Sequence, residues 1–281
     1  MKINLRRRYL ACFITALSAG VAAMPAAIAA EGESANMEEI VIIGSRRAAR
    51  SATDTTAPVD VIAGDELTRN ASTDIQDLMR TAVPSYNVNA QPISDAATIS
   101  RPANLRGLSP DNTLVLVNGK RRHRGSVISF LGGGISDGAQ GVDIATIPSL
   151  ALKRVVVLRD GASSQYGSDA IAGVINFELR DAAQGGFLEV TNGSTYEGDG
   201  DNYRVAGNIG LPLGDSGFVN ITAEYGEVDG TVRSIVRQDV LNLIAAGNTA
   251  AADFKTINSY TGAVPQYWGQ PDVEDDFKIF I

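Results

Sequence analysis

Few residues of this chain could carry out catalysis. Ser163 and Ser164 follow Asp160 closely, which would place a hydroxyl nucleophile near a carboxylate. A serine nucleophile needs a neighbouring base to take its proton, and His123 is the only histidine in the sequence. The Gly-x-Ser-x-Gly turn that presents the nucleophile in α/β-hydrolases is also missing. The sequence therefore predicts that the protein is not an enzyme.

Two further segments could hold an ion. Gly132–Gly141 is as rich in glycine as a phosphate-binding loop, but no Lys-Ser or Lys-Thr pair follows it. The acidic turn Glu197–Asp201 could attract calcium, although the spacing of its ligands is incomplete. A surface loop and a solvated turn are the favoured interpretations. We therefore predict no metal site and no cofactor.

The N-terminus has the three parts of a secretion signal. Four basic residues precede the uncharged stretch Tyr9–Met24, and Ala27-Ile28-Ala29 offers a small-x-small cleavage pattern. Residues 1–29 are therefore predicted to be a signal peptide, with Ala30 as the alternative last residue.

Removal of this leader changes what the rest of the chain can do. Cys12 is the only cysteine, so the mature chain would have neither disulfides nor a thiolate nucleophile. It would keep 20 Lys plus Arg against 32 Asp plus Glu, a formal net charge of −12. An acidic exported chain is a poor partner for nucleic acid, so the basic cluster Lys120–Arg124 is expected to face water. No later segment is apolar for 18 residues, so a membrane could be crossed only by strands.

The strongest extended signal near the N-terminus is Glu38-Glu39-Ile40-Val41-Ile42-Ile43-Gly44. Its four β-branched residues favour a strand, but so short a segment cannot form a stable sheet alone. Two interpretations stay open from these residues. The segment adds as a strand to the sheet of another protein, or it is the first strand of the next domain. The polar, small residues 45–57 indicate a flexible tether.

The middle of the chain alternates short helix and strand patterns, which indicates a compact α/β unit. Thr73 and Gln76 fit a capping box that opens a helix, and Val83-Pro84 ends it. The apolar face of this helix is expected to consist of Ile75, Leu78, Met79 and Ala82.

A two-residue hairpin is the clearest local signal of this unit. Thr113–Val117 and Lys120–His123 flank the dipeptide Asn118-Gly119, which favours a tight turn between antiparallel strands. Further strands are predicted at Val59–Ile62, Asn104–Leu108, Arg154–Leu158 and Ala170–Leu179, a helical turn at Pro148–Lys153, and turns at Arg159–Gly161 and Gln165–Ser168.

Residues 38–180 resemble the N-terminal part of the TonB-dependent outer-membrane receptors. Three motifs carry the resemblance: the box-like Glu38–Gly44, Leu105-Arg106-Gly107 with Leu114-Val115-Leu116-Val117-Asn118-Gly119, and Val155-Val156-Val157-Leu158-Arg159-Asp160-Gly161 with Tyr166-Gly167-Ser168 and Ala172-Gly173-Val174-Ile175-Asn176. Ala162 stands where members of the family often have proline.

This resemblance implies both a fold and a function. It implies an α+β plug domain, a mixed sheet with short helices, at residues 52–180, preceded by a TonB box and tether at residues 30–51. It implies that Glu38–Gly44 binds the inner-membrane TonB protein. The protein would then carry a scarce small ligand, such as a siderophore, cobalamin or a saccharide, across the cell outer membrane, driven by the proton-motive force.

The residues beyond 185 indicate membrane-crossing strands independently of the resemblance. Apolar and polar residues alternate there in segments of about ten residues, which is typical of outer-membrane barrels. A tight turn at Gly214–Gly217 and a long connection after the third strand fit short periplasmic turns and long outer loops. A short helix ending at Gly247 is expected in the long loop. The apolar positions are Leu188, Val190 and Tyr196; Tyr203, Val205, Ile209, Leu211 and Leu213; Val219, Ile221, Ala223 and Tyr225; and Phe277, Ile279 and Ile281.

We therefore expect residues 186–281 to form about the first four antiparallel strands of a transmembrane β-barrel, left incomplete in a truncated chain. Plugged outer-membrane transporters have about 22 strands. A periplasmic binding or adaptor module made of the plug-like unit alone is the alternative. The expected partners are TonB, outer-membrane lipid and a small ligand, with no nucleic acid. Ligand contacts are placed on the plug loops, at Gln91, Ser94, Arg101, Ser126, Gly133, Ser136 and Asp137.

Overall fold

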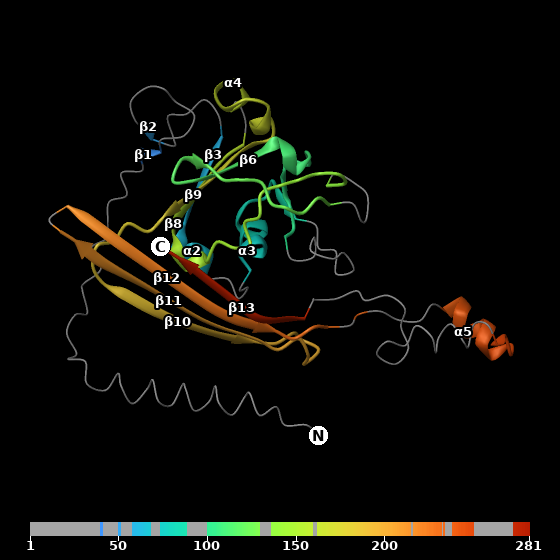
Figure 1. The fold of residues 1–281 in the computed structure, drawn as a ribbon. Helices are drawn as coiled ribbons and strands as arrows, with labels where there is room; N and C mark the ends of the chain where they lie inside the picture. The colour runs from blue at the N-terminus through green and yellow to red at the C-terminus, as the bar shows by residue number, and fades with distance from the viewer. Residues whose placement is uncertain are drawn as a thin grey trace, which may run out of the picture. The chain divides into compact units, whose positions relative to one another are not determined.

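The computed structural model contains a mixed sheet with helices on both faces and a separate antiparallel sheet (Figure 1). The first belongs to residues 58–180, here called the α/β unit. The second is β10–β13, here called the strand wall. The structure describes residues 40–41, 50–51, 58–68, 74–88, 100–129, 136–159, 162–214, 216–231, 233, 238–249 and 272–281.

The sheet of the α/β unit has five strands in the order β3-β8-β9-β6-β7. β6 pairs with β9 in parallel, whereas the other neighbouring pairs are antiparallel, so the sheet is mixed as the sequence predicts. The strands are β3 Val59–Ala63, β6 Thr113–Val117, β7 Lys120–Arg121, β8 Leu152–Leu158 and β9 Gly173–Leu179.

Both faces of this sheet are covered, which explains the unbroken apolar run of β8. Val155 and Val157 pack into the core beneath α2 (Gly64–Thr68) and α3 (Ile75–Ala82). Val156 and Leu158 point to the opposite face, under the segment that carries α4 (Ser163–Tyr166) and η5 (Ser168–Ala170). Alternate residues of one strand therefore serve two cores.

Helix α3 corrects one detail of the predicted capping. Its N-cap is Asp74 rather than Thr73, because the Asp74 carboxylate accepts a hydrogen bond from the backbone N–H of Gln76 at 2.8 Å. Thr73 lies outside the described residues. Ile75, Leu78 and Met79 are buried as expected, and Val83 ends the helix with an N–H bond to the Met79 carbonyl.

The predicted hairpin turn is confirmed. Asn118 and Gly119 have φ values of 49° and 76°, as a turn with two left-handed residues requires. The turn is fixed to β9 by two side-chain amides. Asn118 Oδ1 accepts from Leu179 N at 2.8 Å, and Asn176 Oδ1 accepts from Gly119 N at 2.9 Å.

Several predicted boundaries shift in the structure. The helical turn before β8 is the 3₁₀ segment η4 (Ser149–Ala151), so β8 starts at Leu152 rather than Arg154. The region predicted as a turn at Gln165–Ser168 is occupied by α4 and η5, and β9 starts at Gly173 rather than Ala170. The strand predicted at Asn104–Leu108 ends at Leu105, because Arg106 and Gly107 both have positive φ. Among the described residues, α2, β4 (Tyr86–Val88) and η3 (Pro110–Asn112) were not predicted. Strand β2 (Arg50–Ser51) was not predicted either, because it lies in the segment that we predicted to be a flexible tether.

The strand wall is an open sheet of four antiparallel strands in sequence order. β11 and β12 pair over twelve residues, from Asn202↔Val228 to Leu213↔Gly217. The bounds are β10 Gly186–Gly193, β11 Asn202–Leu213, β12 Gly217–Val228 and β13 Val273–Phe280. The helix expected in the long connection is α5, Gln238–Ala245.

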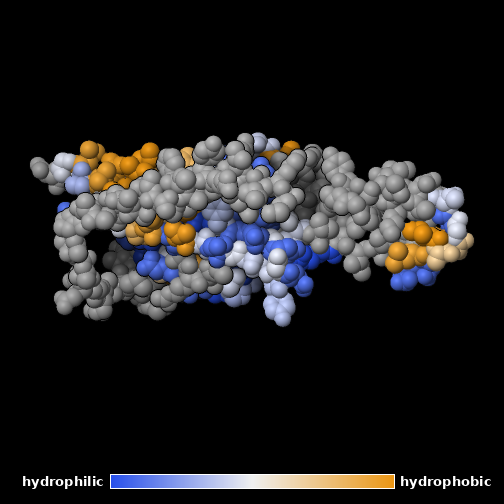
Figure 2. Space-filling view, turned by 90° about the horizontal axis from the view of Figure 1, so that it is seen from below, coloured by the Kyte–Doolittle hydropathy of each residue, from blue (hydrophilic) through white to orange (hydrophobic). Residues whose placement is uncertain are grey.

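The two faces of the strand wall are inverted relative to a soluble sheet. The polar residues that alternate along β11 and β12 are buried, among them Arg204, Thr222 and Glu224. The apolar residues between them lie on the open face, where Leu188, Val190 and Phe277 are each more than 60% exposed. Figure 2 shows hydrophobic surface on the left of the view, at the end of the wall where β11 and β12 join, and on one side of α5. Within the described part of the chain, no helix is long and apolar enough to cross a membrane.

Tyrosines mark one end of the open apolar face. Tyr203 and Tyr225 lie near the start of β11 and the end of β12, with their ring centroids 6.0 Å apart and tilted by 49°. Tyr225 Oη lies 2.8 Å from carboxylate oxygens of Glu227 and Asp275. Aromatic rings followed by charged groups are typical of the boundary between an apolar band and water.

Candidate functional site

The polar face of the strand wall meets the α/β unit at a buried ion cluster. The Arg204 side chain is 4% exposed and pairs with Glu189 on β10 and with Glu224 on β12, the latter at 3.3 Å. Lys278 on β13 binds the other oxygen of Glu224 at 2.9 Å and also contacts Asp276 at 3.0 Å. One cluster of alternating charges thus joins all four strands.

This cluster reaches the α/β unit through one side chain. Arg204 Nη1 donates to Ser149 Oγ at 2.8 Å, and Ser149 is only 2% exposed. Taking several charges out of water is costly unless each is paired and hydrogen-bonded. The arrangement therefore indicates that the α/β unit covers a polar face of the strand wall. The contact between the two sheets is not an apolar core of the kind found in a β-sandwich.

The short segment that connects the α/β unit to the wall is also held firmly. Arg180 Nε donates to the Leu150 carbonyl at 2.9 Å, and its Nη2 donates to Asp65 at 2.9 Å. Its guanidinium carbon lies 4.7 Å from the centre of the Phe187 ring, the geometry of a cation–π contact. Gly210 leaves no room for a side chain, because an added Cβ would collide with the Ala182 carbonyl.

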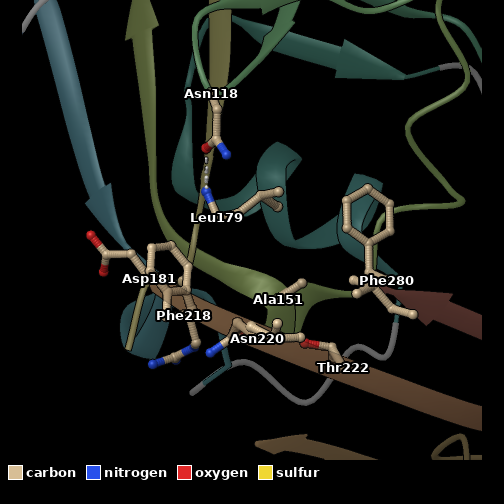
Figure 3. A pocket seen from close by; sticks show the side chains of 11 residues that line it. Asn118, Ala151, Leu179, Asp181, Phe218, Asn220, Thr222 and Phe280 are labelled. Carbon is tan, nitrogen blue, oxygen red and sulfur yellow. Dashed lines mark hydrogen bonds between the residues drawn. The ribbon is translucent and has the colours of Figure 1, made fainter. Parts of the chain in front are cut away.

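A pocket of about 250 Å³ lies between the two parts of the chain (Figure 3). Asn118, Leu179 and Asp181 line it from the α/β unit and the connecting segment, while Phe218 and Phe280 line it from the wall. Figure 3 shows the Asn118 amide directed at the backbone of Leu179, the hydrogen bond that closes the hairpin turn. The Asn118 side chain in this pocket is thus already hydrogen-bonded within the protein.

The predicted ligand-facing residues other than Arg101 divide into three groups. Gln91, Ser94 and Gly133 lie outside the described residues. Ser126 and Asp137 are exposed, and backbone hydrogen bonds from Ser129 to Ala139 and from Gly125 to Gly141 place their two segments side by side. Ser136 is 7% exposed. Contact with a ligand remains a prediction for all of them.

Arg101, another predicted ligand-facing residue, is engaged within the α/β unit. Its guanidinium pairs with the N-cap Asp74 and lies 3.9 Å from Asp77. Burial lowers the pKa of Arg101. Burial also raises the pKa of the nearby Tyr86 hydroxyl, with a further contribution from Asp77.

The basic cluster Lys120–Arg124 mostly faces water, as the sequence predicts, and three of its arginines also contact neighbouring segments of the α/β unit. Arg121 pairs with Asp169 and donates to the Tyr166 carbonyl. Arg122 donates to Thr146 Oγ1 at 2.8 Å, and Arg124 lies 3.7 Å from Asp111. Arg121 and Arg124 are therefore paired with the carboxylates of Asp169 and Asp111, whereas Arg122 hydrogen-bonds to the loop that precedes β8.

The box-like segment is described over two residues. Ile40–Val41 form β1, which pairs antiparallel with β2, Arg50–Ser51. Glu38, Glu39, Ile42, Ile43 and Gly44 lie outside the described residues. The strand conformation predicted for the segment is confirmed at Ile40 and Val41, whereas binding to another protein is untested.

The loops beyond the wall are tied to each other by an ion pair. Asp199, in the acidic turn after β10, binds Arg233 at 2.5 Å and Thr195 Oγ1 at 2.5 Å. The hydrogen bond from Arg233 lowers the pKa of Asp199, and the hydrogen bond from Thr195 adds to this effect. Within the residues that the structure describes, no group of three or more potential metal ligands occurs.

The buried ion cluster was not predicted from the sequence. Arg204 and Glu224 could have been singled out, because charged residues at alternate positions of apolar strands must face something polar. Ser149 carries no such signal. Its role depends on which turn of the α/β unit rests on the wall, and that follows only from the tertiary structure.

Comparison with known proteins bears on both parts of the chain. Residues 51–174 match the family model of the TonB-dependent receptor plug domain. The ferrienterobactin receptor of Escherichia coli K12 is 28% identical over 177 residues, which are 62% of this chain and 23% of that protein. The vitamin B12 transporter BtuB of Photobacterium profundum is 25% identical over 207 residues, 74% of this chain and 30% of that protein.

Among solved structures, the ferric enterobactin receptor PfeA of Pseudomonas aeruginosa in complex with enterobactin has the same fold over 63% of this chain and 26% of its own. The TM-score is 0.51 and the identity 23%, so this likeness concerns the fold alone. The chain spans between 23% and 30% of the length of these relatives.

Proposed function

Since the chain belongs, through residues 51–174, to the TonB-dependent receptors of the cell outer membrane, we propose that the full-length protein takes up a scarce small ligand. The α/β unit would be its plug, and the strand wall would be part of the barrel around it. Two relatives are a ferrienterobactin receptor and a vitamin B12 transporter. Iron–siderophore complexes and cobalamin are therefore the ligand classes proposed first, with saccharides next.

One observation supports this proposal most strongly. The strand wall buries charged residues such as Arg204 and Glu224 against the plug and leaves residues such as Val190 on the open face. A lipid-facing wall around a polar lumen needs this distribution. A soluble periplasmic adaptor, the alternative function, would expose the apolar face to water. Fractionation separates the two, because only the adaptor would be recovered as a soluble monomer.

We assign the segments of the chain on the same basis. Residues 1–29 are proposed as the signal peptide, residues 30–51 as the TonB box and its tether, and residues 52–180 as the plug. Residues 186–281 are proposed as the first barrel strands. Two residues of the proposed box, Ile40 and Val41, are extended and paired through their backbones in β1, and an extended backbone is what strand addition to a TonB sheet would require.

The experiment is uptake by the full-length protein with Ile42→Pro in the box. Proline removes a backbone donor and fixes φ, so strand addition to TonB should fail. Ligand binding at the cell surface should be unchanged, while energy-dependent uptake should fall to the level of a strain without TonB. Ile42→Val, which keeps the β-branched backbone preference, is the matched control. Full uptake by the proline variant would show that the box lies elsewhere.

A further inference from the structure

The η4 turn is the part of the plug that rests on the charged face of the strand wall. We propose that this turn fastens the plug to the barrel wall, with Arg204 as the positioning residue and Ser149 as the group that it holds. Arg204 Nη1 donates to Ser149 Oγ at 2.8 Å, and both residues are almost completely buried.

The wall holds the Arg204 guanidinium in a fixed orientation. Glu189 binds Nη2 from one neighbouring strand, and Glu224 binds Nη1 from the other. Lys278 then compensates the charge of Glu224 at 2.9 Å. A planar guanidinium held by two carboxylates loses little further freedom when it makes one more hydrogen bond. The barrel strands therefore hold Arg204 Nη1 in the orientation in which it donates to Ser149 Oγ.

The plug side of this contact is held equally well. Arg180, at the plug's C-terminal end, donates its backbone N–H to the Ala151 carbonyl at 2.8 Å and its Nε to the Leu150 carbonyl at 2.9 Å. The η4 turn is thus fixed from the wall by Arg204 and from the connecting segment by Arg180. Leu152 begins β8 directly after the turn, so this attachment continues into an inner strand of the plug sheet, between β3 and β9.

The position of this contact gives it a mechanical consequence. The box precedes β3, and β3 is joined to β8 by five register pairs. A force applied to the box therefore reaches β8 and, through η4, the Arg204–Ser149 hydrogen bond. The contact is expected to keep this end of the plug on the wall and to limit leakage along the seam between them.

The test is Ser149→Ala in the full-length protein, measured by hydrogen exchange in detergent or vesicles without ligand or TonB. Loss of a charge-assisted hydrogen bond should accelerate exchange of the amides of residues 149–153 about tenfold. Exchange in β6 and β9 should change less than twofold. Entry of vancomycin, used as a bulky probe of leakage, into cells should rise.

Ser129→Ala is the matched control, because Ser129 is also buried but its hydroxyl has no partner in the described part of the chain. Ser149→Thr, which restores the hydroxyl, should rescue slow exchange. If Ser149→Ala is not recovered in a folded form, Arg204→Lys is measured instead, since it keeps the charge but loses the planar fork. Unchanged exchange at residues 149–153 in the folded variant would overturn the proposal. The inference rests on the proposed function only in placing the strand wall in a barrel. If the uptake experiment with Ile42→Pro contradicted the proposed function, the hydrogen-exchange result at residues 149–153 would still test the contact between Arg204 and Ser149.

Discussion

Gly173, at the start of β9, has a φ of 145° and lies closely against β8 and β5 (Ala103–Leu105). An added Cβ would lie 2.6 Å from Leu105 Cδ2 and would also collide with the Leu158 carbonyl. Gly173→Ala therefore adds backbone strain to overpacking, and we expect it to destabilise the plug by roughly 3 kcal/mol. Denaturant-dependent proteolysis of the full-length protein would measure the loss.

Gly119 provides the comparison for this prediction. Its φ of 76° is also left-handed, but an added Cβ would meet nothing within 4 Å. Gly119→Ala should therefore cost only about 1–2 kcal/mol, the strain of the backbone alone. Equal losses for the two alanine variants would mean that β8 and the Leu105 side chain move aside at Gly173 without cost.

Single residues were the hardest features to predict from the sequence. Thr73 and Asp74 are both good N-caps, and sequence alone could not show that Asp74 takes the position while pairing with Arg101. The cluster Lys120–Arg124 is mostly exposed, as its charges led us to expect. Its ties to Asp169 and Thr146 depend on neighbours 24 to 48 residues away, which no local pattern reveals.

At the scale of elements, the loop ion pair allows a prediction about pH. Hydrogen bonds from Arg233 and Thr195 lower the pKa of Asp199, so the carboxylate stabilises the loops while it is ionised. This contribution is fully present above the ordinary aspartate pKa of about 3.9 and is lost as the pH falls through the lower folded value. Asp199→Asn should therefore accelerate amide exchange around residues 195–201 at pH 7, whereas the wild type loosens only below about pH 4.

Asp201→Asn serves as the control for this loop. Asp201 belongs to the same acidic turn and is exposed, but its backbone carbonyl, which the substitution leaves in place, makes the hydrogen bond to Asp229 N at 2.8 Å. The control should exchange like the wild type at both pH values. If amide exchange around residues 195–201 accelerates equally in both variants, the net charge of the acidic turn, and not the ion pair between Asp199 and Arg233, stabilises these loops.

Elements with a strong period were predicted well, and elements defined by distant partners were not. β11 and β12 follow directly from the alternation of residues such as Ile209 and Asn208, because period 2 requires opposite faces. The three-residue strand β4 exists because it pairs with β5, from Tyr86↔Leu105 to Val88↔Ala103, across a segment that gives no local signal. Helix α2 has five residues, too few for a helical period to show.

At the scale of the whole molecule, the two sheets differ in which residues they bury. The plug sheet buries apolar residues on both faces, whereas the wall buries Arg204, Asn208 and Glu224 and exposes the residues between them. A single chain thus contains one part that buries its apolar residues and one part that exposes them. The mean hydropathy of the chain is close to zero because the composition averages over both parts.

The orientation of the wall can be tested at Val190, which lies midway along β10 and is 67% exposed. If its face meets lipid, Val190→Arg in the full-length protein should cost about 2–4 kcal/mol in folding into vesicles, measured by the heat-dependent shift on a gel. Val190→Leu, which stays apolar, should fold like the wild type. Asn192 lies on the same face nearer the strand end, so Asn192→Arg should cost only about 0–1 kcal/mol. Equal folding of the Val190 variants would place this face against protein or water and would remove the main support for the proposed uptake function.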